Sequence, residues 1–228
     1  MKTHYVLGCG GVGSWLAPSL CLLVGAKSVV LVDGDTLEQK NMNRQLFTRD
    51  DIGKGKAVAL AAKYQCESDS RYYSFGCIQH DANDWLFVCV DNNPARLAAL
   101  RACDQYGCKA IIAANEVMSS EAYVYLPRWK GTGCDPRVFY PELMTNHGND
   151  PLAPAGCTGE AQERTRQLVS ANFQAAALAQ SLFVLWGLKA NSITRQTMTM
   201  MPHHYRANIS RLETLKIENK LNQRTENE

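Results

Sequence analysis

The stretch Gly8-Cys9-Gly10-Gly11-Val12-Gly13-Ser14 decides the fold, because it joins a short apolar strand to a helix through a glycine-rich turn. Tyr5 to Leu7 form the strand, Ser14 to Val24 have helical spacing of apolar residues, and Val29 to Val32 form a second apolar strand. The glycines permit a tight bend and let the backbone approach a phosphate. Amides at the start of the helix would face that anion. The stretch therefore predicts a strand, helix, strand unit with a nucleotide-binding turn.

The same alternation continues along the chain. Lys56 to Tyr64 and Pro94 to Cys103 are predicted helices, whereas Trp85 to Val90 and Ala110 to Ala113 are predicted strands. This order predicts an α/β, Rossmann-like fold with a mostly parallel sheet and helices on both faces. In such sheets ligands bind at the carboxyl ends of the strands.

The second half of the chain predicts a C-terminal helix and antiparallel strands. We expect a strand from Glu121 to Leu126, an irregular connection from Pro127 to Leu152 and a helical region from Gln162 to Leu188. Thr197 to Met201 and Tyr205 to Ile209 can pair as strands across the turn between them. We therefore expect one domain over residues 1–210 and a polar, partly disordered tail over residues 211–228.

Composition narrows the functional classes. The 228 residues are 46% hydrophobic, enough for one sizeable core, and a formal net charge of +2 gives no general reason to bind nucleic acid or a membrane. No apolar signal segment begins the chain, and its longest apolar run, Ala175 to Leu188, is shorter than the roughly 20 residues that span a bilayer. Nine scattered cysteines cannot all pair within one chain, so we expect reduced thiols and a cytoplasmic location.

Charged side chains follow the predicted strands. Asp33 comes after the second strand, where a carboxylate suits ribose hydroxyls, and Asp91 comes after a later strand. Arg44 and Lys56 lie on segments near the same strand ends and can neutralise a polyphosphate, which a hydride-transfer site does not require. The glycine turn and Asp33 alone would also fit an NAD(P)-dependent oxidoreductase. In a purely structural interpretation, Asp33 and Asp35 are turn residues and Lys56 belongs to a solvated helix start.

Four motifs in this order resemble a known family. They are Gly-x-Gly-Gly-x-Gly-Ser at residues 8–14, Asp-x-Asp at 33–35, Asn-x-Asn-Arg-Gln at 41–45 and Gly-x-x-Lys at 53–56, followed by Asp91-Asn92 and Arg96. Over about its first half, the chain resembles the adenylation core shared by ThiF, MoeB and the ubiquitin-activating enzymes. The resemblance implies an enzyme that binds ATP and Mg²⁺. Its substrate would be the C-terminal carboxylate of a small ubiquitin-like or sulfur-carrier protein ending in Gly-Gly, adenylated with release of pyrophosphate.

The resemblance also implies roles for individual residues. Asp33 would bind the ribose, and Asn41, Arg44 and Lys56 would contact the phosphates. Asp91 would hold the magnesium ion, for which a carboxylate beside phosphate oxygens is a suitable ligand. The residues implied to line the nucleotide are Gly8, Gly10, Gly11, Gly13, Asp33, Asp35, Asn41, Arg44, Lys56, Asp91 and Asn92.

A second step would transfer the activated carrier to a cysteine. The resemblance points to Cys157, ahead of the long helical region, whose thiolate would attack the acyl adenylate. Cys134 is a competitor, and either thiol could instead be buried or idle. The closest cysteine spacing, Cys103 to Cys108, does not fit paired Cys-x-x-Cys ligands, so no zinc is expected.

Assembly is the last expectation. The resemblance implies a homodimer, and such relatives often supply an arginine in trans from a segment ahead of the first strand. That segment is almost absent here, so a phosphate contact in trans stays open. A catalytically inactive partner subunit of an activating enzyme is a further alternative.

Overall fold

The computed structural model describes residues 2–116, 118–145, 168–188, 203–208 and 213–217. The strands are β1 (His4–Leu7), β2 (Val29–Val32), β3 (Glu67–Asp69), β4 (Trp85–Val88), β5 (Lys109–Asn115), β6 (Ser119–Tyr125), β7 (His204–Asn208) and β8 (Glu213–Ile217). The α-helices are α1 (Gly13–Val24), α2 (Lys56–Tyr64), α3 (Asn93–Tyr106), α4 (Pro136–Phe139), α5 (Glu142–Thr145) and α6 (Val169–Phe183). Shorter turns are η1 (Ala26–Ser28), η2 (Gln39–Asn41), η3 (Arg49–Asp51), η4 (Pro127–Trp129) and the π-helical η6 (Val184–Leu188).

The described strands form one eight-stranded sheet in the order β3-β2-β1-β4-β5-β6-β7-β8. Pairings from β3 through β5 are parallel, and the remaining three are antiparallel. The predicted Rossmann-like α/β fold with a mostly parallel sheet is therefore confirmed. Its non-sequential order puts β1 between β2 and β4, so that the glycine turn after β1 lies between the ends of two neighbouring strands.

The antiparallel part differs in its pairing from the expectation. β7 overlaps the predicted strand Tyr205 to Ile209, but its described partners are β6 and β8. The expected partner, residues 197–201, lies outside the described residues. β8 falls within the segment expected to be a polar tail, and it continues the sheet past residue 210.

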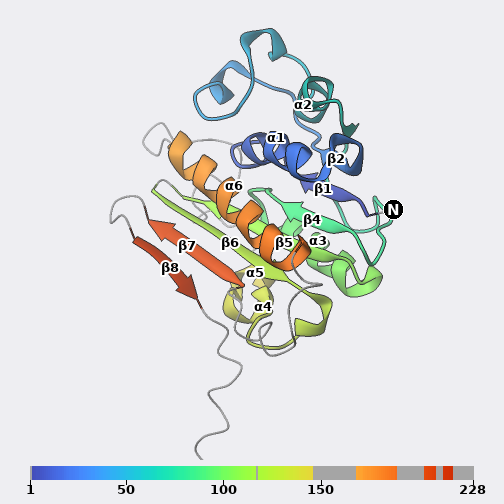
Figure 1. Cartoon of the computed structure of the whole chain (residues 1–228), viewed down its shortest axis with the longest axis vertical. Coiled ribbons are helices and arrows are strands. Elements are labelled where there is room, and N and C mark those ends of the chain that lie inside the picture. Colours follow the sequence, from blue (N-terminus) through green and yellow to red (C-terminus); the bar gives the residue numbers. More distant parts are fainter. Residues whose placement is uncertain (1, 117, 146–167, 189–202, 209–212, 218–228) are drawn as a thin grey trace, which may run out of the picture.

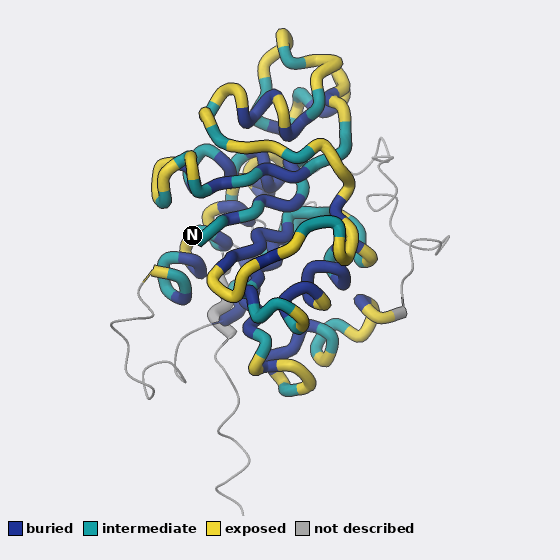
Figure 2. The backbone as a smooth tube through the Cα atoms, turned by 90° about the vertical axis from the view of Figure 1, so that its right-hand side faces the viewer, coloured by how far each residue is buried: buried dark blue, intermediate teal, exposed yellow. Residues whose placement is uncertain are grey.

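Helices cover both faces of the sheet (Figure 1). α1 and α6 pack against each other on one face, with α6 over β5 and β6, while α3 lies on the other face beside α5. Phe183 at the end of α6 makes edge-to-face contacts with the rings of His4, Trp85 and Phe87. Figure 2 shows the buried backbone passing through the middle of the molecule and exposed segments around it. No helix in the described ranges has the length and apolarity needed to cross a membrane.

Two features of the structure were not predicted. β3 has only three residues, two of them exposed and none apolar, so no hydrophobic pattern predicts it. The strand forms by pairing with β2 at the edge of the sheet. The connection predicted to be irregular contains η4, α4 and α5. η4 and α4 begin at prolines, which suit the first turn of a helix because they lack the unneeded N–H.

Candidate nucleotide-binding site

The ends of β1, β2 and β4 bring three chain segments together at the carboxyl edge of the sheet. Leu7 pairs in register with Val32 and with Val88. The Gly8 amide donates to the Val32 carbonyl at 2.8 Å, and the Cys89 amide donates to the Leu7 carbonyl at 2.8 Å. The glycine turn, the Asp33 segment and the segment leading to Asp91 therefore begin side by side.

The fold requires glycine at some positions of the turn but not at all of them. Gly8 has a φ of +88°, and a Cβ there would lie 3.0 Å from the Cys89 carbonyl group. A Cβ on Gly13 would lie 1.8 Å from the Gly8 oxygen. Both positions thus need glycine for the turn itself. At Gly10 a Cβ would meet only Gln45 Nε2 at 3.6 Å, an ordinary contact, so the fold does not demand glycine there.

The start of α1 faces this turn. Among the described residues, no side chain caps the first turn of the helix. The Ser14, Trp15 and Leu16 amides donate to the Gly10 and Val12 carbonyls, so the amides left for an anion are those of residues 10–13, just ahead of them. The helix dipole favours negative charge at that end. The uncapped helix start and the space beside Gly10 fit a phosphate group.

Asp33 connects β2 to the glycine turn. Its Oδ2 accepts the Cys9 amide at 2.6 Å and its Oδ1 accepts the Asp35 amide at 2.7 Å. Burial raises the pKa of Asp33, while these two backbone bonds act in the opposite direction. The carboxyl group thus has a structural role in holding the turn, and its remaining lone pairs can accept from ribose hydroxyls.

Lys56 is buried at the start of α2 and paired with Asp35. Its Nζ donates to Asp35 Oδ2 at 2.7 Å, with the lysine side chain 8% exposed and the aspartate 47% exposed. The Tyr72 hydroxyl donates to the other oxygen, Oδ1, at 2.8 Å. Burial acts to raise the pKa of Asp35, but the bonds from Lys56 and Tyr72 outweigh it and lower that pKa. The lysine charge is therefore held beside Asp33, with a carboxylate as its present partner.

Arg44 lies on a loop fixed to α1. The Leu46 amide donates to Ser14 Oγ at 3.0 Å, and Trp15 Nε1 donates to the Arg44 carbonyl at 3.1 Å. The guanidinium donates only to the Lys40 carbonyl and Asn43 Oδ1, both at 3.1 Å, so no carboxylate among the described residues neutralises it. Its backbone is anchored at the glycine turn while its charge is still available to an anion.

Asn41 and Asn92 have structural partners. Asn41 is buried, and its Oδ1 accepts the Glu38 amide at 3.1 Å, which closes the turn that carries the Arg44 loop. Asn92 Oδ1 accepts the Ala95 amide at 2.9 Å and so caps α3. Asp91 is different: it is exposed, and within the described part of the chain its carboxylate makes no hydrogen bond or ion pair. Such a carboxylate is available to a cation.

The family comparison agrees with this arrangement, because the model of the ThiF family matches residues 2–222. This chain belongs to the ThiF family. The resemblance inferred from the motifs is thereby confirmed, and the match extends well beyond the first half of the chain on which those motifs lie.

Curated relatives of this ThiF-family chain include activating enzymes. Ubiquitin-like modifier-activating enzyme 5 of Drosophila persimilis is 31% identical over 125 residues, 46% of this chain and 32% of that protein. The NEDD8-activating enzyme E1 catalytic subunit of Saccharomyces cerevisiae is 50% identical over 60 residues, 26% of this chain and 20% of that protein. The match thus spans about a third or less of these relatives.

Solved structures share the fold. A crystal structure of Escherichia coli MccB with ATP superimposes with a TM-score of 0.64 at 16% identity, covering 95% of this chain and 64% of that one. A crystal structure of PaaA gives a TM-score of 0.65, also at 16% identity, covering 96% of this chain and 64% of that one. At this identity the likeness shows the ThiF-like fold alone.

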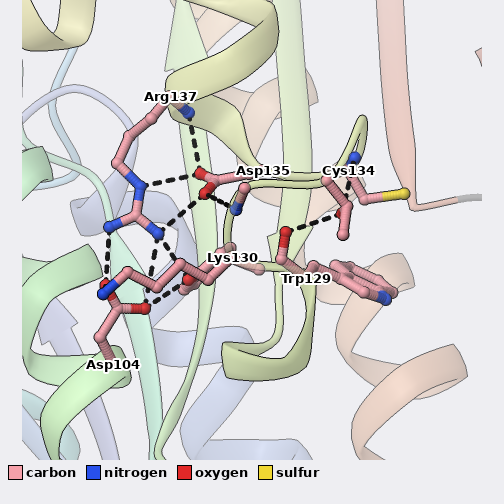
Figure 3. A network of polar contacts seen from close by, with 9 residues as sticks. Asp104, Trp129, Lys130, Cys134, Asp135 and Arg137 are labelled. Atoms are coloured by element: carbon pink, nitrogen blue, oxygen red, sulfur yellow. Dashed lines mark hydrogen bonds and ion pairs between the residues drawn. The ribbon is translucent and has the colours of Figure 1, made fainter.

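The two candidate acceptor cysteines stand differently in this ThiF-family structure. Cys157 lies outside the described residues. Cys134 is 1% exposed, on a loop that the Asp135 carboxylate closes by accepting the Gly131 amide at 2.8 Å (Figure 3). Arg137 Nε then binds Asp135 at 2.8 Å. The Cys134 thiol is thus enclosed and cannot meet a protein-sized acyl donor in this conformation.

Asp91 is the candidate for holding a cation at the carboxyl edge of the sheet. Among the described residues, no three or more His, Cys, Asp or Glu side chains gather where they could hold a metal ion. A magnesium ion that takes most of its ligands from phosphate and water needs only one or two protein carboxylates, and Asp91 fits that requirement.

Sequence reasoning missed three side chains that build this region. Tyr72 reaches Asp35 from the loop after β3, Trp15 reaches the Arg44 carbonyl from α1, and Asn172 reaches the same carbonyl from α6 at 3.3 Å. None belongs to a recognisable motif. Only tertiary packing brings them to the site.

Proposed function

We propose that this chain catalyses ATP-dependent adenylation of the C-terminal carboxylate of a small ubiquitin-like or sulfur-carrier protein ending in Gly-Gly. Membership of the ThiF family and the similarity to ubiquitin-like modifier-activating enzymes support adenylation of a carboxylate. The shared fold with MccB, crystallised with ATP, supports ATP as the nucleotide. One observation carries the proposal: Asp33 and the Arg44 loop are both hydrogen-bonded to the segment of residues 9–15, and Asp91, which follows the neighbouring strand β4, has no partner among the described residues.

In this proposal each group at the sheet edge has a defined task. Gly8, Gly10, Gly11 and Gly13 line the nucleotide together with the first amides of α1, and Asp33 and Asp35 lie on its ribose side. Arg44, Lys56 and Asn41 contact the phosphates, and Asp91, with Asn92 beside it, holds Mg²⁺. A carboxylate oxygen of the carrier attacks the α-phosphorus, and the bond to pyrophosphate breaks. Arg44 and Lys56 stabilise the charge that develops on the leaving group.

Pyrophosphate exchange tests the adenylation step. We expect exchange with wild-type protein in the presence of a carrier ending in Gly-Gly, and a loss of at least about 100-fold in Asp91→Ala, because the magnesium ion loses its protein carboxylate. Asp81→Ala is the matched control. Asp81 is also exposed, but it precedes β4 and so lies toward the opposite edge of the sheet. Wild-type exchange in Asp91→Ala would refute the magnesium role.

Thioester formation is tested separately on the two cysteines. We expect Cys157→Ala to leave exchange intact and to remove any reducing-agent-sensitive adduct with the carrier. Cys134→Ala should keep both activities, because its thiol is enclosed. An adduct that persists in Cys157→Ala and disappears in Cys134→Ala would reverse the assignment.

The remaining alternatives give different results in the same experiment. An inactive partner subunit would support no exchange with any carrier, and Arg44→Ala and Lys56→Ala would change nothing. An oxidoreductase would bind NAD(P) and would leave both cations without a task. We further propose a homodimer in the cytoplasm, with reduced cysteines and a single adenylation domain that extends through β8; sedimentation measures the oligomeric state.

A further inference from the structure

Asn172 connects α6 to the carboxyl edge of the sheet, where the proposed phosphate-binding residues lie. It lies on α6, is 0% exposed, and its Nδ2 donates to the Arg44 carbonyl at 3.3 Å. Trp15 Nε1 donates to the same carbonyl at 3.1 Å from α1. One peptide oxygen therefore receives two side-chain donors from two helices that pack against each other.

The Asn172 amide also lies against the glycine turn. A Cβ on Gly11 would be 2.8 Å from Asn172 Oδ1 and 3.0 Å from both Cγ and Nδ2. The 2.8 Å separation is shorter than real Cβ contacts, so a larger residue at position 11 requires the Asn172 amide to shift. The close approach of Asn172 thus favours glycine at position 11.

Asn172 Oδ1 is buried and has no hydrogen-bond partner among the described residues. A buried acceptor without a donor destabilises the fold, and an apolar side chain of similar size would avoid that cost. Groups that break this rule are typically found at functional sites. The Nδ2 group of the Asn172 amide makes the hydrogen bond, and it donates to the Arg44 carbonyl.

We propose that Asn172 is a positioning residue for the nucleotide: it fixes the Arg44 backbone against the glycine turn and favours glycine at position 11. The proposal rests on the proposed function, in which the Arg44 guanidinium contacts phosphate. Among the described residues, that guanidinium is bound only by groups of its own loop, so its place relative to the turn depends on what anchors the loop. Asn172 and Trp15 provide that anchor at the arginine itself.

Removing the donor while keeping the shape tests the first half of the proposal. Asn172→Asp has no N–H to give the Arg44 carbonyl, and we expect the Kd for ATP, measured by calorimetry, to rise about tenfold or more. Trp15→Phe removes the other donor and keeps an aromatic ring beside Phe173, with an expected rise of about threefold. Gln180→Glu makes the same amide-to-acid change on α6, at a side chain without a hydrogen bond to the site, and should leave ATP binding unchanged.

A suppressor pair tests the second half. We expect Gly11→Ala to weaken ATP binding at least about tenfold, because the new methyl displaces the Asn172 amide. If that is the cause, Gly11→Ala combined with Asn172→Ala will bind ATP within about twofold of Asn172→Ala alone. A purely structural role of Asn172 in α6 does not produce this non-additivity. If the methyl instead collides with the nucleotide, the two losses will multiply.

Failure of this proposal can be told apart from failure of the proposed function. Wild-type protein that binds no ATP overturns both. Wild-type protein that binds ATP, with unchanged affinity in Asn172→Asp and Trp15→Phe or with multiplied losses in the suppressor pair, overturns the role of Asn172 alone. Should the buried carboxylate prevent Asn172→Asp from folding, Trp15→Phe and the suppressor pair decide the outcome.

Discussion

Two clusters of charge in this molecule are built in opposite ways. The Arg137 cluster, formed by Asp104, Asp135, Arg137 and Lys130, joins α3 to the loop around α4 (Figure 3). Arg137 binds Asp104 at 2.7 Å and Asp135 at 2.8 Å, with the three side chains 12%, 12% and 3% exposed. At the carboxyl edge of β1, β2 and β4, by contrast, Arg44 has no carboxylate partner and Asp91 makes no ion pair within the described residues.

The difference distinguishes charges that serve the fold from charges kept for a ligand. A buried charge is tolerated only when it is paired and hydrogen-bonded, as Asp104, Asp135 and Arg137 are. Among the described residues, Arg44 is bound only by neutral groups and the exposed Asp91 has no partner, so both gain little from their neighbours. Such groups contribute little to stability, and in the proposed function they bind phosphate and magnesium. Changes in the first cluster should therefore alter stability, and changes in the second should alter activity.

Arg137→Met gives the largest expected effect on stability. It keeps much of the side-chain volume but leaves Asp104 and Asp135 buried without their guanidinium, which should lower the free energy of unfolding by about 3–5 kcal/mol. Urea unfolding measures the loss, and Arg101→Met on the exposed side of α3 is the control. A loss below about 1 kcal/mol would mean that pairing in this cluster does not serve the fold.

Glu121 extends the comparison to pH, because its carboxylate is also held by a cluster of donors. It accepts from Tyr140 at 2.6 Å and from Arg206 at 2.7 Å, and the side chain is 16% exposed. Burial acts to raise its pKa, but His204, Tyr140 and Arg206 lower it to about 2. A lowered carboxyl pKa adds stability above the unfolded value near 4.5, and that stability is lost as the pH falls toward 2.

The matching prediction concerns Glu121→Gln. At neutral pH the variant should be less stable than wild type by at most about 3 kcal/mol, and the difference should shrink as the pH falls from about 5 toward 2. Urea unfolding at several pH values measures it. A difference that does not depend on pH would show that the carboxylate charge is not what the cluster stabilises.

The sequence predicts this molecule best where local spacing carries the information. The glycine turn between two apolar strands, together with the alternation of helices and strands that continues to Ala113, predicts the parallel half and the edge at which ligands are expected to bind. β3 escapes prediction because it is short, polar and stabilised only by its neighbour. The pairing of β7 with β6 escapes it because the contact spans about 80 residues, and no local pattern selects one partner strand over another.

The same limit applies within the site. Lys56 and Arg44 can be predicted from motifs, but their partners cannot. Tyr72 lies 37 residues from Asp35, and Asn172 lies 128 residues from Arg44. The sequence predicts an irregular connection around Cys134. In the structure the Asp135 carboxylate closes this loop by accepting the Gly131 amide. Burial and pairing of this kind arise from tertiary packing, which single-sequence patterns do not encode.

Lys56 has features both of a charge that stabilises the fold and of a charge available to a ligand. Asp35→Asn tests which of these two roles it has. The lysine is buried and paired like a structural charge, but its partner is half-exposed and lies close to the proposed nucleotide site. Asparagine keeps the shape and the contact with Tyr72 but removes the negative charge, so without ATP we expect a loss of about 1 kcal/mol, small because solvent reaches the pair.

Adding ATP should then affect the stability of Asp35→Asn and of wild type differently. If Lys56 exchanges Asp35 for phosphate when the nucleotide binds, removing its competitor raises the affinity, so the increase in Tm on adding ATP and Mg²⁺ will be larger in Asp35→Asn than in wild type. Asp104→Asn, which breaks an aspartate–arginine pair in the Arg137 cluster, is the control. A smaller increase in Asp35→Asn would mean that the aspartate assists nucleotide binding and that the two residues act as a pair. Lys56 would then belong with Arg137 as a charge that needs its carboxylate, and Arg44 alone would carry the phosphate charge.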